Sequence, residues 1–274
     1  MTDKMVRTRV KNGLWEVALP RVFRLPGSVA SWQQAVSAAC LYSDGCASHA
    51  CAARLHRLDG FDRARVEITT SRRVVPVRGV RFHLCRSKIE RVCRIGGIPA
   101  TDLVRTVLDV AGTEQIDAVE LGLEDTLRRG VPIESYRREV AGPCHGIAGR
   151  AAVRRLLKDR PLDHVPMRSA LEVQTLRTLL SAKLPRPVYE HPVPTRGGFT
   201  LHPDFSYPED LIAMECQSFR HHSGRGAFDD DIDRRRFLRE LGWTVVEVTS
   251  TWLRKDPQGF VAHIRKLLVM RNAL

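Results

Sequence analysis

The succession of hydrophobic patterns in the C-terminal part of the chain constrains the fold most strongly. It predicts one helix, three strands, a second helix, a fourth strand and a closing helix. Strands that are interrupted by a helix need a sheet with helices packed against it. The fold class expected here is therefore α/β, with a sheet flanked by helices. The predicted elements are 169–184, 188–193, 199–205, 211–216, 229–241, 243–249 and 260–270.

A polar stretch between two prolines, KDRPLDHVP over 158–166, precedes these elements and is typical of a connection between domains. The 274 residues exceed one ordinary core and suit two domains of roughly 100–150 residues each. We therefore expect an N-terminal domain over 1–160 and a C-terminal domain over 161–274. The first is expected to be a small mixed α+β structure, which makes the whole chain α+β.

Short alternating and β-branched runs are prominent in the N-terminal part. The segment 13–25 alternates apolar and polar residues and stops at Pro26-Gly27, which predicts a hairpin. Residues 31–58 predict helices, and Thr101 and Ser135 are placed to cap two later ones. Three β-branched runs predict a small antiparallel sheet with arginines in its turns. The three runs are 66–70, 74–77 and 80–84.

Basic residues outnumber acidic ones, 44 to 31, which gives a net charge of +13. A charge of this size favours a polyanionic partner, nucleic acid first. The excess is N-terminal, with 28 Lys and Arg against 17 Asp and Glu up to residue 160, and 16 against 14 after it. Arginine forks suit phosphate groups, although a merely solvated surface is the alternative. The candidate DNA-binding residues are Arg63, Arg65, Arg72, Arg73, Arg78, Arg81, Arg86 and Lys88.

Two classes of protein are disfavoured by composition. No apolar run approaches the roughly 18–20 residues of a membrane span, so no membrane partner is expected. The cysteines number seven, and none forms a CxxC pair, which disfavours a disulfide scaffold or a zinc ribbon. Cys40, Cys46, Cys51 and His49 lie close in sequence, but their spacing favours buried apolar side chains over a metal site. We expect a protein of the reducing cytoplasm.

Two carboxylates mark a candidate site in the C-terminal domain. Glu215 and Gln217 lie two apart on a predicted strand and therefore face the same side. A hairpin through 207–210 would bring Asp204 toward Glu215. Converging carboxylates are what Mg²⁺ requires, and such an ion can activate water for attack on a phosphate. Glu172, three residues after Ser169, is either a capping-box carboxylate or an outer ligand of the metal water.

Four short motifs follow one another in this part of the chain, with a trailing pattern behind them. They are Ser169-x-x-Glu172, Pro203-Asp204-Phe205, Glu215-Cys216-Gln217 and His221-His222, then Asp231-x-x-Arg234, Leu238 and Gly242-Trp243. Over about 165–270 the chain resembles the PD-(D/E)XK nuclease superfamily, in the branch of very-short-patch mismatch-repair endonucleases. The resemblance implies a restriction-endonuclease-like core.

The same resemblance implies roles for individual residues. Asp204 corresponds to a metal ligand and Glu172 to the acidic residue of the helix, and Glu215 and Gln217 belong to the second catalytic strand. His222 matches a histidine that can transfer protons. Relatives usually carry Glu-x-Asp-Gly over 215–218, and the superfamily's lysine is replaced here by Gln217. A neutral amide can orient water but cannot act as a strong base, so an inert nuclease core is the alternative.

The N-terminal part carries a second set of motifs. They are Gly13-Leu14-Trp15 with Arg21-Val22-Phe23-Arg24-Leu25, Ser48-His49, and Gly97-Ile98-Pro99-Ala100-Thr101 with Arg105-Thr106-Val107-Leu108-Asp109-Val110-Ala111. Residues 10–155 resemble the AbiEi-type antitoxin and regulator family. This implies DNA binding, repression of a toxin–antitoxin operon and a cognate toxin. About a dozen residues precede Gly13, which are too few for the helix-turn-helix before the wing, so a truncated winged helix is expected.

Together these patterns predict a two-domain, DNA-acting protein of the defence or toxin–antitoxin type. Its second domain would be a Mg²⁺- or Mn²⁺-dependent endonuclease. Asp204 and Glu215 would hold the metal, Glu172 and His222 would assist proton transfer, and Gln217 would position water. The alternative is a non-catalytic DNA-binding regulator or antitoxin with an inert nuclease fold. The residues favour no particular oligomeric state.

Overall fold

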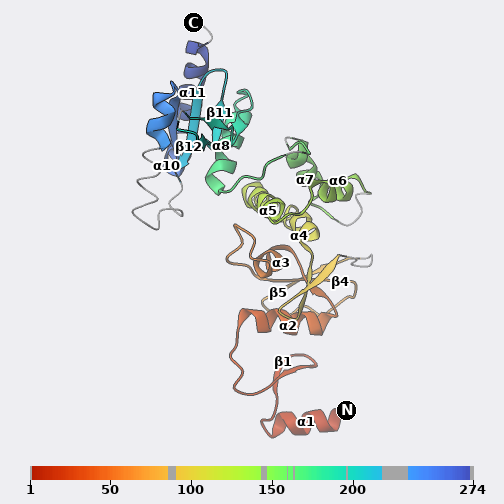
Figure 1. Cartoon of the computed structure of the whole chain (residues 1–274). Coiled ribbons are helices and arrows are strands. Elements are labelled where there is room, and N and C mark those ends of the chain that lie inside the picture. The colour runs from red at the N-terminus through yellow and green to blue at the C-terminus, as the bar shows by residue number, and fades with distance from the viewer. Residues whose placement is uncertain are drawn as a thin grey trace. The chain divides into compact units, whose positions relative to one another are not determined.

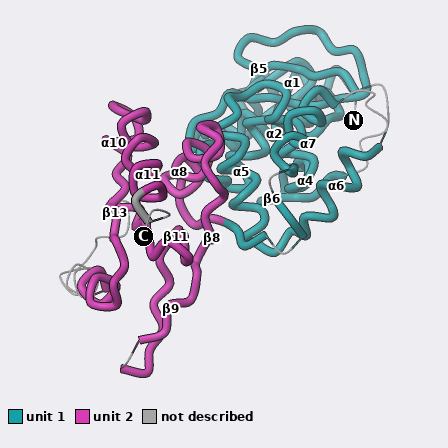
Figure 2. The backbone as a smooth tube through the Cα atoms, turned by 90° about the horizontal axis from the view of Figure 1, so that it is seen from above, with its two compact units in different colours: residues 1–166 teal, residues 167–274 magenta. Residues whose placement is uncertain are grey.

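The computed structural model describes residues 2–85, 91–142, 147–158, 160–162, 164–195, 197–217 and 234–271. The chain divides into two compact units, Met1–Pro166 and Met167–Leu274 (Figure 2). The division lies at the end of the predicted connecting stretch 158–166. Both units combine helices with sheets, which confirms the predicted mixed α and β class.

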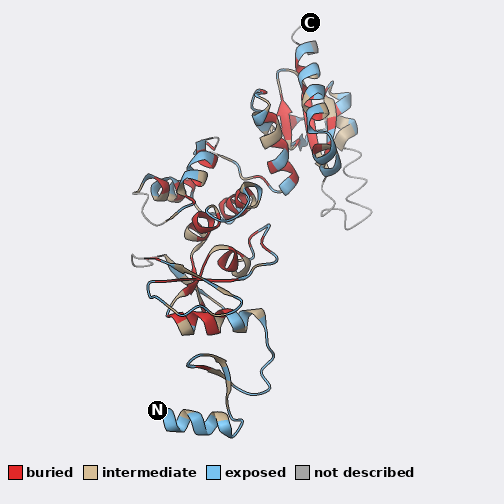
Figure 3. Ribbon diagram, turned by 180° about the vertical axis from the view of Figure 1, so that it is seen from behind, coloured by how far each residue is buried: buried red, intermediate tan, exposed pale blue. Residues whose placement is uncertain are grey.

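The first unit begins with a helix and a hairpin. Helix α1 (Asp3–Lys11) has no buried residue, and most of its residues are exposed (Figure 3). Strands β1 (Glu16–Leu19) and β2 (Val22–Arg24) pair antiparallel, as the alternation over 13–25 predicts. The Trp15 and Phe23 rings lie 5.6 Å apart and Arg9 lies over Trp15, which ties α1 to the hairpin.

A five-stranded sheet follows, in the order β5-β4-β3-β7-β6. The predicted antiparallel arrangement is wrong, because β4 pairs parallel with β5, and 74–77 forms no strand. That segment contains Pro76, which has no N–H for a ladder, and leaves the Val75 side chain 72% exposed. The chain crosses over there instead of turning back. The strands are β3 (Cys46–Ala47), β4 (Val66–Thr70), β5 (Val80–Leu84), β6 (Val92–Ile95) and β7 (Ile98–Thr101).

Two helices come before and after the short strand β3, and four more follow the sheet (Figure 1). The helical core gathers large buried side chains such as Leu108, Leu123 and Tyr136. The stretch 31–58, which predicts helices throughout, is interrupted by β3 between α2 and α3. The helices are α2 (Trp32–Ser43), α3 (His49–Leu55), α4 (Leu103–Val110), α5 (Ile116–Arg128), α6 (Ile133–Ala141) and α7 (Arg150–Lys158).

Two predicted helix caps are wrong by one to three residues. The N-cap of α4 is Asp102, whose carboxylate accepts from the Arg105 N–H at 2.8 Å. Thr101 is still part of strand β7, and its hydroxyl bonds Thr106 inside the core. Helix α6 begins after Pro132, whose fixed φ suits a helix start, so Ser135 lies within its first turn. In both cases the neighbouring element decides where the helix begins.

Two residues of the predicted connecting stretch form ion pairs with helix α5. The Arg160 side chain is 3% exposed and lies 2.6 Å from the Glu120 carboxylate and 2.7 Å from that of Glu124. His164 bonds Glu124 from the other side at 3.0 Å. Because these contacts bury full charges on α5, the residues around 160–164 belong to the first unit and are not a free linker.

The second unit contains a four-stranded sheet in the order β13-β12-β11-β8, with helix α8 (Ala170–Ser181) packed against β12. Strand β12 runs antiparallel to β11 and parallel to β13. The predicted strands 188–193 and 199–205 are each divided in two, because Pro192 and Pro203 cannot donate to a ladder. The elements are β8 (Val188–Tyr189), β9 (Val193–Pro194), β10 (Thr200–Leu201), β11 (Phe205–Tyr207), β12 (Ile212–Gln217), β13 (Thr244–Thr249), α10 (Ser250–Lys255) and α11 (Pro257–Arg271).

The two faces of β12 have different neighbours. Ala213 packs with Leu238 and Trp243 in one core. Cys216, on the other face, lies 3.5 Å from the Thr175 hydroxyl of α8. Since side chains alternate along a strand, Glu215 and Gln217 share the face of Ala213. Within the described ranges, no helix has the length and apolarity that crossing a bilayer would take.

Candidate active site

The hairpin between β11 and β12 sets the geometry of the candidate site. Its register pairs Phe205 with Met214. By that register the next pair outward is Asp204 with Glu215, and directly opposed residues of an antiparallel pair point to the same face. The Cys216 N–H donates to Asp204 Oδ2 at 2.7 Å, which holds the Asp204 carboxyl against the end of β12. The fold thus places the two predicted metal ligands at the same end of the central β11–β12 pair.

One cationic side chain interacts with both carboxylates. Arg234 Nε lies 3.2 Å from Glu215 Oε1. Burial raises the pKa of Asp204 to about 6, and the Glu172 and Glu190 carboxylates add to this rise of the pKa. The Arg234 guanidinium acts in the opposite direction on the pKa of Asp204. The carboxylates of Glu172 and Glu190 are therefore close enough to Asp204 to affect its pKa, and a positive charge beside them is stabilising.

A hollow of about 450 Å³ opens beside Asp204. It contains His202, which lies two residues before Asp204 and is exposed. The Arg168 guanidinium, also exposed, pairs with Glu190 at 2.8 Å. The sequence analysis did not predict His202 and Arg168 as site residues. The position of His202, two residues before the candidate metal ligand Asp204, could have indicated it. The lining residues are Arg168, Glu190, Thr200, Leu201, His202, Asp204 and Arg234.

Glu172 is fully engaged in the first turn of α8. Its Oε1 accepts from the Ser169 hydroxyl at 2.7 Å, and the Glu172 N–H donates back to Ser169 Oγ. Its Oε2 accepts from the Arg168 N–H at 2.8 Å and from the Tyr189 hydroxyl at 2.6 Å. These bonds resemble a capping box, one of the two predicted roles, except that the carboxylate accepts from the N–H of Arg168 and the hydroxyl of Ser169. The role of outer metal ligand stays a prediction.

Replacing Glu172 with glutamine is expected to lower the free energy of unfolding by about 1–2 kcal/mol. The amide has one acceptor oxygen, so it can keep the donors at the Oε2 position or the donor at the Oε1 position, but its NH₂ cannot accept from the others, and at least one bond is lost. Urea unfolding followed by circular dichroism measures the loss. Glu209→Gln, in the exposed turn of the same sheet, is the matched control. An unchanged unfolding midpoint for the Glu172 variant would contradict the capping role.

The remaining predicted site residues are half-buried, exposed or outside the described residues. Gln217 ends β12 half-buried, on the face of Glu215. His222, Arg86 and Lys88 lie outside the described residues. The other six predicted DNA-binding arginines are all exposed, around β4, β5 and the segment that joins them. They are Arg63, Arg65, Arg72, Arg73, Arg78 and Arg81.

Clusters that could hold a metal ion by three or more His, Cys, Asp or Glu side chains are absent from the described part of the chain. If Asp204 and Glu215 are ligands, they would offer two protein oxygens, and water or phosphate oxygens would have to complete a Mg²⁺ shell. Cys40 and Cys51 lie in the core beneath α2, and burial raises the pKa of Cys40 to about 12 and that of Cys51 to about 11. Such thiols remain protonated, as expected for apolar side chains.

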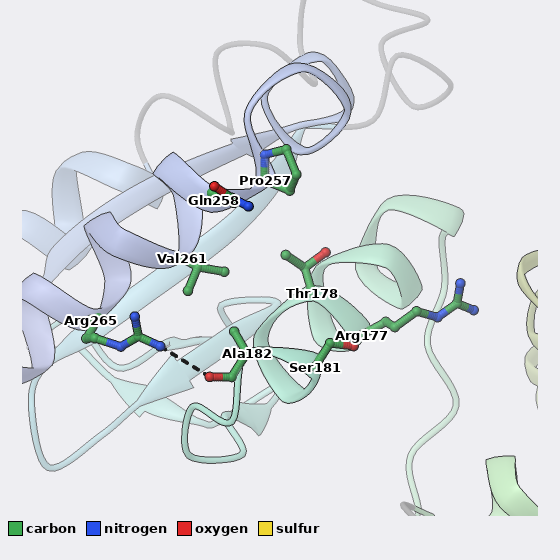
Figure 4. Close-up of a pocket in the computed structure, with 8 residues that line it drawn as sticks. All are labelled: Arg177, Thr178, Ser181, Ala182, Pro257, Gln258, Val261 and Arg265. Carbon is green, nitrogen blue, oxygen red and sulfur yellow. Dashed lines mark hydrogen bonds between the residues drawn. The ribbon is translucent and has the colours of Figure 1, made fainter.

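A second hollow of the unit lies between α8 and α11 (Figure 4). Arg265 points across it and donates to the Ala182 carbonyl at 3.2 Å. The described residues that line it include two arginines but no carboxylate, histidine or cysteine. It can contact an anion and has no group for acid–base chemistry. The lining residues are Arg177, Thr178, Ser181, Ala182, Pro257, Gln258, Val261 and Arg265.

Comparison with known proteins gives relatives without a stated activity. No model of a known protein family matches the chain. The uncharacterized proteins MT2308 and Rv2248, from two strains of Mycobacterium tuberculosis, are each 28% identical to it over 178 residues. The match covers 65% of this chain and 65% of each relative, so the chain spans less than two thirds of their length.

Proposed function

We propose that this chain is a DNA-acting protein of the defence or toxin–antitoxin type, and that its second unit hydrolyses phosphodiester bonds with Mg²⁺ or Mn²⁺. The observation that carries the proposal is the convergence of Asp204 and Glu215 on a single positive group, Arg234. Two carboxylates that share one cationic neighbour could share a divalent ion in its place. The resemblance to PD-(D/E)XK nucleases and to AbiEi-type regulators supports the same conclusion.

The donor set fits a hard divalent cation. Asp204 and Glu215 would hold it through oxygen atoms, and the surplus of acidic groups around Asp204 favours its binding. When bound, the cation would polarise a phosphate oxygen and lower the pKa of a water molecule. The Cys216 N–H fixes the orientation of the Asp204 carboxyl, so this ligand needs no rearrangement.

The chain's own residues supply the other parts of the proposed site. Arg168, whose side chain is 70% exposed, can contact a phosphate of the DNA backbone at the rim of the hollow. His202 is exposed in the same hollow and can give a proton to a leaving oxygen. Gln217 can orient water through its amide but cannot take up its proton. His222, the predicted proton-transfer residue, stays part of the hypothesis.

Cleavage of supercoiled plasmid DNA tests the proposed activity. We expect the purified protein to nick the plasmid in Mg²⁺ or Mn²⁺ and to leave it intact in EDTA. Ca²⁺ is expected to support binding better than cleavage, because it holds its ligands in a looser geometry. Gel electrophoresis of a time course measures the nicked fraction. Identical traces with and without the divalent ions would overturn the hydrolytic part of the proposal.

A second candidate function is DNA binding without cleavage. Two observations favour it: Arg234 already neutralises Glu215, and the Glu172 carboxylate is saturated by donors. Helix α1 has no buried residue and carries basic residues, and Arg21 in the turn of the hairpin is exposed. A regulator that represses its own operon and pairs with a cognate toxin would need these surfaces and no hydrolysis.

The double variant Arg72→Ala, Arg73→Ala is expected to weaken DNA binding under both functions. Both arginines are exposed in the segment after β4. If both contact phosphates, the slope of log K against log salt should fall by about 2, because each contact releases nearly one counterion. Fluorescence anisotropy of labelled duplex DNA over a salt series measures this. Arg138→Ala, in an exposed position of α6, is the control, and equal slopes for both variants would exclude this arginine surface.

A further inference from the structure

A polar layer lies inside the first unit, where a hydrophobic one would be expected. Ile68 of β4 faces the apolar core under α2. Glu67 and Thr69, its neighbours, face the other way, and the parallel register sets Arg81 beside Glu67 and His83 beside Thr69. Burying polar groups on a sheet face is costly unless they are paired or used for binding. This layer is separate from the carboxylates of the second unit.

A hollow of about 410 Å³ opens on this layer, a size suited to a small ligand. It is bounded by β4 and β5, by helix α4, and by residues that follow α4 and precede α7. Its walls combine two arginines, one aspartate and two histidines. The lining residues are His49, Thr69, Arg81, Phe82, His83, Leu84, Cys85, Arg105, Asp109, Gly112, Thr113, Ile147 and Ala148.

Two buried polar atoms in this hollow have no hydrogen-bond partner among the described residues. Asp109 is 4% exposed; its Oδ1 accepts from Arg105 Nε at 2.7 Å, whereas its Oδ2 has no partner. Thr69 is 2% exposed, and its hydroxyl has no partner either. Burial raises the pKa of Asp109 to about 6. The hollow therefore offers one strong acceptor and one hydroxyl to a ligand that carries N–H donors.

A strained histidine contributes an aromatic surface. His49 has φ 52°, a left-handed conformation that is costly for a residue with a side chain. Its Nδ1 lies 2.9 Å from the Ser48 hydroxyl, and its ring stacks on that of His83 with centroids 3.6 Å apart. Burial, followed by the neighbouring His83, lowers the pKa of His49 to about 3, so this ring is neutral. Neutral imidazoles can stack on a nucleobase.

The rim of the hollow carries a charged side chain, Arg81. The Arg81 side chain is 63% exposed and lies 3.8 Å from Glu67 Oε1, a distance at which the guanidinium can still turn toward an anion. Glu67 Oε1 also lies 3.2 Å from His83 Nε2, and this contact holds the His83 ring in its position against His49. A suitable ligand would have a flat ring with N–H donors at one end and an anionic group at the other. Its ring would meet the histidines and Asp109, and its anionic group would meet Arg81.

We propose that this hollow binds a nucleotide unit. Asp109 Oδ2 and the Thr69 hydroxyl would hold the edge of a base that carries an amino group, the base would lie against His49 and His83, and its phosphate would reach Arg81. Either a free nucleotide or one nucleotide of a DNA strand has this chemistry. Such binding requires no hydrolysis by the second unit.

Titration of the full chain with nucleotides tests the proposal. The probes are AMP, CMP and GMP, with ribose 5-phosphate and inorganic phosphate as ligands that lack a base. We expect at least one nucleotide to bind about tenfold or more tightly than ribose 5-phosphate, measured by isothermal titration calorimetry. A short single-stranded oligonucleotide forms the second arm. Tighter binding of the oligonucleotide than of any nucleotide would identify a strand as the source, and the reverse a free nucleotide.

Two variants tie the binding to this hollow. Asp109→Asn is expected to weaken nucleotide binding about tenfold, since the amide loses the charged acceptor. Because it also alters the bond to Arg105, Thr69→Val serves as a second, nearly isosteric variant with a loss of about fivefold. Arg138→Ala, exposed on α6 and outside the hollow, should bind nucleotide like the unchanged protein. Equal binding of ribose 5-phosphate and nucleotides, or wild-type affinity in both hollow variants, would overturn the proposal.

Discussion

Replacing Asp204 with asparagine is expected to reduce Mg²⁺-dependent plasmid nicking by about 100-fold or more. The amide keeps an oxygen that can accept from the Cys216 N–H, so the end of β12 stays in place. What it loses is the negative charge that, with Glu215, would hold the cation. DNA binding in the absence of divalent ions should remain at the wild-type level.

The same variant should be more stable than the wild type near neutral pH. The folded protein keeps the Asp204 proton up to about pH 6, because its pKa is raised, whereas the unfolded chain releases it near the ordinary value. Ionisation therefore costs stability as the pH rises from about 4 to 6, and asparagine avoids this cost. The expected gain is about 1–3 kcal/mol above pH 6 and close to zero below pH 4. Urea unfolding at several pH values measures it.

The control for Asp204 lies in the same hairpin. Glu209→Gln removes one negative charge from its exposed turn and should change neither nicking nor the pH dependence of unfolding. If the Asp204 variant nicks DNA like the wild type, the catalytic proposal is wrong. If its stability gain is the same at pH 4 and pH 7.5, the gain does not come from a desolvated carboxyl.

Arg160→Ala is expected to lower the free energy of unfolding of the first unit by about 3–5 kcal/mol. The change leaves the Glu120 and Glu124 carboxylates buried without the guanidinium that lies 2.6–2.7 Å from them. It also removes the bond that Arg160 donates to the Leu156 carbonyl. This is the largest loss of stability that we expect from a single substitution in the chain.

Thermal and urea unfolding of the full chain measure the effect of Arg160. Arg155→Ala is the matched control, since this arginine is exposed on α7, close by in the sequence, and should cost less than about 0.5 kcal/mol. A double variant that also replaces Glu124 with glutamine should lose less than the sum of the two single changes, because the residues are coupled. A loss for Arg160→Ala as small as that of the control would mean that the cluster contributes nothing to folding.

Local patterns predicted the parts of the fold that depend on neighbours in sequence. The alternation over 13–25 predicts the β1–β2 hairpin, and the apolar alternation near 243–249 predicts β13. Ser169 was predicted at the start of the helix that begins at residue 170, and its hydroxyl caps that helix. The turn over 207–210 predicts the pairing of β11 with β12, and Asp204 and Glu215 lie next to the last pair of that ladder.

Errors arose where a distant element or a proline overrides the local signal. A β-branched run that contains Pro76 does not form a strand, and the strands on either side of it pair parallel instead of antiparallel. Thr101 looks like a helix cap, but sheet pairing holds it in β7. Propensity is a weak preference, and tertiary packing decides between the alternatives.

Composition, charge and short-range spacing thus determined the mixed α and β class, the excess of exposed arginines and the pair of carboxylates on one hairpin. Only the tertiary structure decided which side chains complete the sites. Arg160 meets Glu120 across 40 residues, and His56 meets Thr101 across 45. The stacking of His49 on His83 and the approach of Arg234 to Glu215 have the same origin. Such contacts depend on how helices and sheets pack, and no local period in the sequence encodes that packing.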